Sequence, residues 1–226
     1  MIKSNPGHSL AVLLGLLLAF LGAVAGTASG ASGVAATSGV NGRYRNTYYY
    51  SVQESDFKGQ PQTEEMRDMN EKVVARVSKG FMKEISIEGS GRLLDGRIIN
   101  FQGRKEGVAR WTTTRHEFGR GVGDCPLIPF HTIAVDPERI PLGSVVYIPG
   151  TEGMRLPDGS IHDGVWRAED IGSAILKDRM DLFVGDGDQG RILEAYGITS
   201  LMPLTVKLIE ETTSASCVNQ PPSLTD

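Results

Sequence analysis

Short β-favouring runs, separated by turns that contain glycine or proline, recur from residue 43 to residue 209 and constrain the fold more than any other feature. The clearest pair is residues 93–99, where Asp95-Gly96 between two apolar runs supplies the positive φ angles of a tight hairpin turn. Many short strands at close intervals, with few helical patterns, are typical of a small barrel rather than of a βαβ sheet. The sequence therefore predicts a mainly β protein.

The individual elements follow from local pattern. Residues 44–52 are rich in tyrosine, and residues 111–114 form a Trp-Thr-Thr-Thr strand that leads into a glycine-rich loop. Helical turns are expected over 78–84 and over 188–196, which ends before Gly197, and a poorly patterned helix is expected from residue 63. Further strands are predicted at 72–77, 85–87, 131–136, 144–148, 165–170, 180–184 and 204–209.

Charge and length narrow the class of protein. The chain has 226 residues and a formal net charge of −4, with no long basic run, which argues against a nucleic-acid surface. This length accommodates one generous domain or two small ones with a real hydrophobic core.

The N-terminus predicts export. Lys3 precedes an apolar stretch over residues 10–25 that ends in the small-x-small sequence of residues 23–25, so residues 1–25 are expected to be a signal peptide. An uncleaved membrane anchor is the alternative, and it would be the protein's one contact with the membrane. Residues 26–42 have the Gly/Ser/Ala composition of a flexible spacer, residues 43–211 the pattern of a folded domain with an N-terminal extension, and residues 212–226 that of a polar tail. The expected location is the periplasm or the cell envelope.

The cysteines and histidines bear on whether the chain holds a disulfide or a metal site. Cys125 and Cys217 could form a disulfide in an exported protein, or remain two unpaired thiols. The four histidines are scattered without ligand spacing, so no metal site and no cofactor is expected.

Residues 168–184 hold the candidate chemistry. Asp170 and Asp181 each lie at the edge of an apolar run, and Gly172, Ser173 and Ala174 leave the first carboxylate sterically open. Such a carboxylate can serve as an acid or base on a bulky substrate, although an aspartate beside glycine also caps turns.

The runs I-A-V-D-P-E-R-I-P-L-G-S-V-V-Y-I-P-G, G-V-W-R-A-E-D-I-G-S-A-I and D-R-M-D-L-F together resemble the 3D domain, which is named for three aspartates. Here these are Asp136, Asp170 and Asp181. The domain is shared by membrane-bound lytic transglycosylases of the A type and by smaller exported proteins, and the resemblance implies a six-stranded double-psi β-barrel. The resemblance is strongest over residues 125–184, and the segment from residue 72 looks compatible with the same barrel.

The resemblance also implies an activity on peptidoglycan glycan strands. A lytic transglycosylase cleaves the β-1,4 bond between N-acetylmuramic acid and N-acetylglucosamine without water, and one carboxyl group serves as both acid and base. Asp170 matches the family's catalytic aspartate, and Asp181 and Asp136 are expected to tune it or to hold the sugar. Gly172, Ser173, Ala174 and Lys177 are the candidate substrate-binding residues.

Departures from the family pattern keep two other functions open. Ser173 replaces a usual glycine and Asp178 adds a charge, and a chain of this length has little room for the second domain of the large transglycosylases. A non-catalytic expansin-like wall-binding module and a glycoside hydrolase are therefore the alternatives.

Several further residues have two interpretations. Trp111 and Trp166 could stack on sugars or lie in the core, and Arg115 and His116 could line a groove or lie on the surface. Glu169 is expected on the face opposite Asp170, solvated or in a salt bridge.

Overall fold

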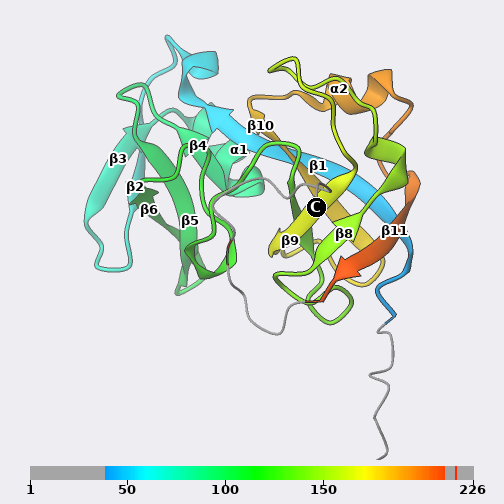
Figure 1. The fold of residues 1–226 in the computed structure, drawn as a ribbon. Helices are drawn as coiled ribbons and strands as arrows, with labels where there is room; N and C mark the ends of the chain where they lie inside the picture. The colour runs from blue at the N-terminus through cyan, green and yellow to red at the C-terminus, as the bar shows by residue number, and fades with distance from the viewer. Residues whose placement is uncertain (1–38, 212–216, 218–226) are drawn as a thin grey trace, which may run out of the picture. The chain divides into compact units, whose positions relative to one another are not determined.

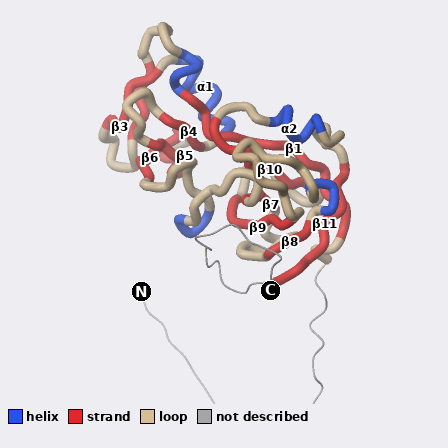
Figure 2. Tube along the Cα trace, turned by 45° about the horizontal axis from the view of Figure 1, so that its top comes forward, coloured by secondary structure: helices blue, strands red, loops and turns tan. Residues whose placement is uncertain are grey.

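The computed structural model describes residues 39–211 and Cys217, so the predicted signal peptide, most of the predicted spacer and most of the polar tail lie outside the described residues. In this part of the chain, no helix is both long and apolar enough to cross a bilayer. The fold is mainly β, with short helices (Figures 1 and 2).

Six strands close into a barrel. The order is β10-β7-β9-β8-β11-β1, and β1 pairs with β10 to complete the ring. The β1–β10 and β7–β9 pairs are parallel, and the other four are antiparallel. The prediction of a mainly β, six-stranded barrel with short helices is thus confirmed. The barrel strands are β1 (Gly42–Gln53), β7 (Thr132–Val135), β8 (Val145–Tyr147), β9 (Val165–Asp170), β10 (Arg179–Asp186) and β11 (Pro203–Glu210).

Alternating apolar residues fill the barrel. Ile133 and Val135 of β7 belong to the same buried cluster as Met180, Leu182 and Val184 of β10. Because successive side chains of a strand point to opposite faces, the residues between them, such as Ala134 and Asp181, lie on the outer face. The outer face of these strands is where the candidate carboxylates are found.

Residues between β1 and β7 form a second group of strands, which we call the insert (residues 54–126). Its strands are β2 (Glu64–Arg67), β3 (Val73–Val77), β4 (Ser90–Arg92), β5 (Ile98–Lys105) and β6 (Val108–Thr114). It has its own apolar cluster, which includes Phe81, Ile99 and Trp111. The segment from residue 72 to residue 114, which looked compatible with the barrel, therefore lies outside the barrel strands. The insert has its own apolar cluster, although the length of the chain had suggested little room for a second domain.

Strand β1 connects the two groups. Figure 1 shows it as one long arrow, whose first half pairs with β11 and β10 and whose end pairs with β4 through Val52 and Gly91. A tight hairpin joins β4 to β5, as the Asp-Gly signal predicts, and the Gly96 N–H donates to Leu93 O at 2.9 Å. Of the Asp-Gly pair only Gly96 has a positive φ, +85°, so the turn lacks the pair of positive φ angles that the sequence predicted.

Two local predictions in the insert were wrong. The predicted helix from residue 63 is strand β2, which pairs with β3. The predicted strand at 85–87 lies inside helix α1 (Lys79–Glu88), since Phe81 and Ile85 are spaced by one helical turn and both are fully buried. Ser78 caps the start of this helix and Gly89, with φ +84°, ends it.

The remaining elements are short. Helix α2 (Gly190–Ala195) lies within the region predicted as helical. Three 3₁₀ turns are η1 (Glu54–Phe57), η2 (Val122–Asp124) and η3 (Pro149–Thr151).

Candidate functional site

Strand register brings two of the three aspartates into one row. Thr47 of β1 pairs with Asp181 of β10, Asp181 pairs with Ala134 of β7, and Ala134 pairs with Asp170 of β9. We call these four residues the acidic row. Neighbouring strands lie about 4.8 Å apart, so the Cα atoms of Asp170 and Asp181 are separated by roughly 10 Å. Ala134, which lies between them, is buried in an apolar cluster with Tyr49, Leu127 and Phe183 on this face.

A β-bulge aims Asp170 at this face. Trp166 and Ala168 of β9 point into the barrel core, and simple alternation would turn Asp170 inward as well. The β7–β9 register shifts between Ile133 and Ala134, so β9 carries one extra residue and Asp170 joins the row. Bulges of this kind re-aim side chains next to active sites.

Both carboxylate oxygens of Asp170 accept a hydrogen bond. The Ile171 N–H donates to Oδ1 at 2.8 Å, and the Tyr49 hydroxyl donates to Oδ2 at 2.9 Å. Burial raises the pKa of Asp170 to about 7, against the lowering effect of these two donors, and the charge of Asp181 raises it further. As a residue Asp170 is intermediate in exposure, and its carboxyl group holds a proton near neutral pH.

Asp181 has a similar environment. Burial raises its pKa to about 6, and a hydrogen bond from Thr47 and the charge of Arg179 act in the opposite direction. Its Oδ1 atom is buried and has no hydrogen-bond partner among the described residues. Burial raises both pKa values, and the charge of Asp181, when ionised, favours the protonated form of Asp170.

Asp136 differs from the other two aspartates. It is buried and follows β7, and its carboxylate accepts the Lys177 N–H at 2.6 Å and the Glu138 N–H at 3.0 Å. These two backbone hydrogen bonds, together with the charge of Arg139, hold its pKa below the usual range. Asp136 thereby fastens the loop between β9 and β10 to the end of β7.

The candidate substrate-binding residues lie in that loop. The Ile175 N–H donates to Gly172 O at 2.9 Å, which closes a turn directly after Asp170. Ser173, Ala174 and Lys177 are exposed, and Lys177 has the left-handed φ of +61° at which its N–H meets Asp136. Ser173 has no positive φ, so serine fits this turn without backbone strain.

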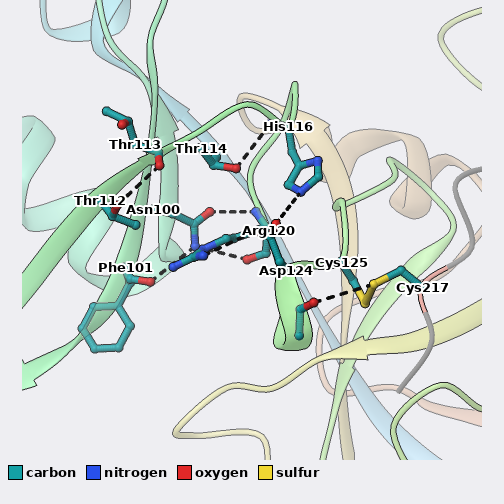
Figure 3. A network of polar contacts seen from close by, with 11 residues as sticks. Asn100, Phe101, Thr112, Thr113, Thr114, His116, Arg120, Asp124, Cys125 and Cys217 are labelled. Atoms are coloured by element: carbon teal, nitrogen blue, oxygen red, sulfur yellow. Dashed lines mark hydrogen bonds and ion pairs between the residues drawn. A yellow bond between two sulfur atoms is a disulfide. The ribbon is translucent and has the colours of Figure 1, made fainter. Parts of the chain in front are cut away.

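A loop from the insert covers the other side of Asp170. A Cβ atom on Gly121 would lie 2.2 Å from Glu169 O and 3.3 Å from the Asp170 Cβ, so the backbone can approach this closely only at a glycine. Figure 3 shows how the loop is held: Asn100 exchanges two hydrogen bonds with the backbone of Arg120, whose N–H donates to Asn100 Oδ1 at 2.7 Å and whose carbonyl accepts from Nδ2 at 3.1 Å. Asp124 forms ion pairs with Arg120 and His116.

The two cysteines secure the end of the same loop. Cys125 and Cys217 form a disulfide that links residues 92 apart in the sequence (Figure 3). The chain segment that approaches Asp170 is thus fixed at both ends, by Asn100 on one side and by the disulfide on the other.

The other residues singled out in the sequence do not contribute to the row. Trp111 and Trp166 are core residues, 1% and 0% exposed. Glu169 is buried and paired with Arg167 at 2.9 Å. Arg115 is exposed. Among the described residues, no group of three or more His, Cys, Asp or Glu side chains could hold a metal ion.

Tyr49 is a site residue that the sequence did not reveal. It lies in the tyrosine-rich strand β1, and its ring is buried against Phe183 at 5.0 Å between centroids. Burial and the nearby Asp170 raise the pKa of Tyr49 well above its usual value, so the phenol keeps its proton and donates it. The sequence placed Tyr49 in a strand, but the contact of its hydroxyl with Asp170 can be recognised only when the pairing of β1 with β10 is known.

A comparison with known proteins identifies a domain in the chain. Residues 131–198 match the 3D domain, as the sequence motifs predicted. No curated protein matches the chain.

Solved structures with a similar fold include three lytic transglycosylases. The structure of Escherichia coli MltA with bound chitohexaose is 15% identical, with a TM-score of 0.52, and the match covers 74% of this chain and 72% of that one. The membrane-bound lytic murein transglycosylase of Agrobacterium tumefaciens is 16% identical, with a TM-score of 0.42 and coverage of 71% and 56%. LtgG of Burkholderia pseudomallei is 18% identical, with a TM-score of 0.39 and coverage of 75% and 71%. At 15% identity, the match to the E. coli MltA structure bears on the fold alone.

Proposed function

We propose that this protein is an exported lytic transglycosylase of peptidoglycan that acts in the periplasm or cell envelope, with Asp170 as its acid and base. The observation that carries the proposal is a carboxyl group of intermediate exposure at a strand end, whose pKa is raised to about 7 by burial and which lies in one row with the second carboxyl group, Asp181. The fold shared with MltA, whose structure holds chitohexaose, supports a glycan strand as the substrate.

The first step uses the protonated form of Asp170. Asp170 donates its proton to the glycosidic oxygen, the bond to the anomeric carbon of N-acetylmuramic acid breaks, and positive charge develops on that sugar. Asp181, ionised at neutral pH, stabilises this charge from across the row. The Tyr49 hydroxyl and the Ile171 N–H hold the resulting Asp170 carboxylate in place.

The second step uses Asp170 as the base. The carboxylate takes the proton of the muramyl 6-hydroxyl while that oxygen attacks the anomeric carbon, and a 1,6-anhydro ring forms. A pKa near the working pH suits a group that must both give and accept a proton. Asp136 acts here as a positioning residue, because it holds the loop that carries Gly172, Ser173, Ala174 and Lys177 beside the sugar.

The test is digestion of purified peptidoglycan followed by mass analysis of the products. Wild type is expected to release anhydromuropeptides, and Asp170→Asn is expected to lose activity by roughly 10²- to 10⁴-fold, the usual contribution of a general acid or base. Asp178→Asn is the matched control, since Asp178 lies in the same stretch but forms an exposed ion pair with Arg45.

Other outcomes would reject the proposal in distinct ways. Reducing-end products that depend on Asp170 would identify a glycoside hydrolase, with water between the two carboxylates. Glycan binding without products would identify a non-catalytic, expansin-like module. Undiminished activity of Asp170→Asn would overturn the assignment of the site.

A further inference from the structure

A cavity of about 370 Å³ lies at one end of the barrel, between the start of β7, the end of β10 and the loop over residues 156–160, and takes no part in the chemistry above. Phe130 and Val184 are its buried apolar residues, and Ile128, Pro129 and Leu156 add apolar wall. Polar groups come from His131, Asp158, Ser160, Asp186 and Gln189. An apolar cavity of this size with a few polar groups is typical of a small-ligand site.

Two features connect the cavity to Asp170. The first is a series of aromatic contacts: Tyr49, which donates to Asp170, packs on Phe183, and Phe183 meets Phe118, whose ring centroid is 6.3 Å away, at the cavity wall. The second is the loop of the insert, which places Phe118 at the cavity and Gly121 against Asp170. The insert loop therefore contributes to the surroundings of Asp170 and to the cavity wall, and a flexible substituent on a sugar at Asp170 would have to pass over the aromatic side chains between them to enter the cavity.

The two carboxylates of the cavity, Asp158 and Asp186, differ in the groups that they contact. Asp186 accepts hydrogen bonds from Arg92 and Gln53, both at 3.0 Å, so an arginine already offsets its charge. Asp158 accepts from the N–H and the hydroxyl of Ser160, both neutral donors, and these, with a smaller effect from the charge of His131 in the same cavity, hold its pKa below the usual range. Among the described cavity residues, Asp158 is thus the carboxylate whose charge no arginine or lysine offsets.

A carboxylate at the rim of an apolar cavity favours a cation on an aliphatic chain. The methylene groups can lie on Pro129 and Leu156, while the cation meets Asp158 and remains partly hydrated. Peptidoglycan carries such a group next to the sugar that is cleaved, because the peptide stem on N-acetylmuramic acid contains a diamino acid with a free amine.

We propose that this cavity binds the peptide stem of the substrate, with the side-chain ammonium of its diamino acid at Asp158. This inference rests on the proposed function for the identity of the ligand, and it assigns the peptide branch a site of its own, separate from the acidic row. The enzyme would then distinguish glycan strands that carry peptides from strands that lack them.

The test is calorimetric binding of a free stem peptide, L-alanyl-γ-D-glutamyl-L-lysyl-D-alanine, to the purified protein. We expect saturable binding that weakens at least tenfold when the lysine amine is acetylated, and also in Asp158→Asn. Asparagine keeps the oxygen that accepts from Ser160, so this variant removes the charge and retains the turn. Asp56→Asn is the matched control, an exposed aspartate in the 3₁₀ turn η1 of the insert.

Each result separates this inference from the proposed function. Absence of peptide binding, or equal binding of the acetylated peptide, overturns the inference even if glycan is cleaved. If the protein binds the peptide through its amine but cleaves no glycan, the peptide remains the ligand of the cavity and the proposed lytic activity is rejected.

Discussion

The aspartates of the acidic row and the aspartate that anchors the neighbouring loop, Asp136, lie in two opposite environments. Asp170 and Asp181 lie on the outer barrel face, where burial dominates and raises their pKa values to about 7 and about 6. Asp136 accepts two backbone N–H groups, which lower its pKa. The first environment favours a bound proton, and the second favours a fixed charge.

This difference indicates different roles for three residues that share one motif. A carboxyl group that holds its proton near pH 7 can donate it, whereas a carboxylate held by backbone donors fastens two segments together. The 3D motif therefore combines reactive groups with the anchor of the loop beside them. Four predictions test this division.

The largest expected effect concerns stability. In Asp170→Asn, the free energy of unfolding at pH 8 should exceed that of wild type by something on the order of 1–3 kcal/mol, less than the full pKa shift because the group is partly exposed. The raised pKa of Asp170 favours the folded state at low pH, and this contribution is lost as the pH rises from the unfolded value of 3.8 through about 7. Urea unfolding between pH 4 and pH 8 measures the difference, which should vanish near pH 4.

Asp136→Asn is the comparison variant for the same experiment. The lowered pKa of Asp136 contributes stability above its ordinary value of 3.8, and this contribution is lost as the pH falls. The variant should therefore be less stable than wild type at pH 8, with a smaller difference at pH 3. If Asp170→Asn and Asp136→Asn shift stability in the same direction at pH 8, the two environments are not opposed.

The second prediction concerns the hydroxyl of Tyr49. Tyr49→Phe removes a donor that lowers the pKa of Asp170, so Asp170 should keep its proton to higher pH. The alkaline limb of the kcat/KM profile should move up by roughly one pH unit, since a hydrogen bond to a charged group contributes about 1.5–3 kcal/mol in full. An unchanged limb with a uniformly lower rate would show that Tyr49 has a packing role only.

The third prediction has the opposite sign. Asp181→Asn removes the charge that helps to raise the pKa of Asp170, so the alkaline limb should move down. The shift should be smaller than that of Tyr49→Phe, because burial is the main cause of the raised pKa and the charge of Asp181 is the smallest of the causes. In the double variant the two shifts should largely cancel, and a limb that moves the same way in both single variants would contradict the coupling across the row.

The sequence predicted the elements of the barrel better than the geometry of the site. Strands β7 to β11 follow from local alternation and from the turns between them, because the outward and inward faces of these strands differ in polarity. The aspartates were found by their motif. Their pairing across four strands is a non-local property of register, which the order of residues along one strand does not contain.

Three particulars show why the rest was missed. The bulge that turns Asp170 outward cannot be recognised from the pattern of apolar residues. Simple alternation along β9 would point the Asp170 side chain into the core. Residues 85–87 alternate like a strand, but they are helical in the structure because helix α1 buries Phe81 and Ile85 on one face. Gly121 is one of several glycines in its loop, and its close approach to Glu169 and Asp170 depends on how the insert meets the barrel.

The smallest expected effect concerns Ser173, the position that departs from the usual glycine. Ser173 is exposed and lies in a turn closed by Gly172 and Ile175, with no positive φ that would require glycine. Ser173→Gly should therefore change kcat/KM by no more than roughly twofold and lower stability by about 0.5–1 kcal/mol, through the added freedom of the unfolded chain. Ala174→Gly, one residue on and equally exposed, is the matched control for backbone freedom without loss of a hydroxyl. A tenfold change in kcat/KM for Ser173→Gly alone would mean that the serine hydroxyl contacts the substrate, and the reactive face would then extend from the acidic row into the loop that Asp136 anchors.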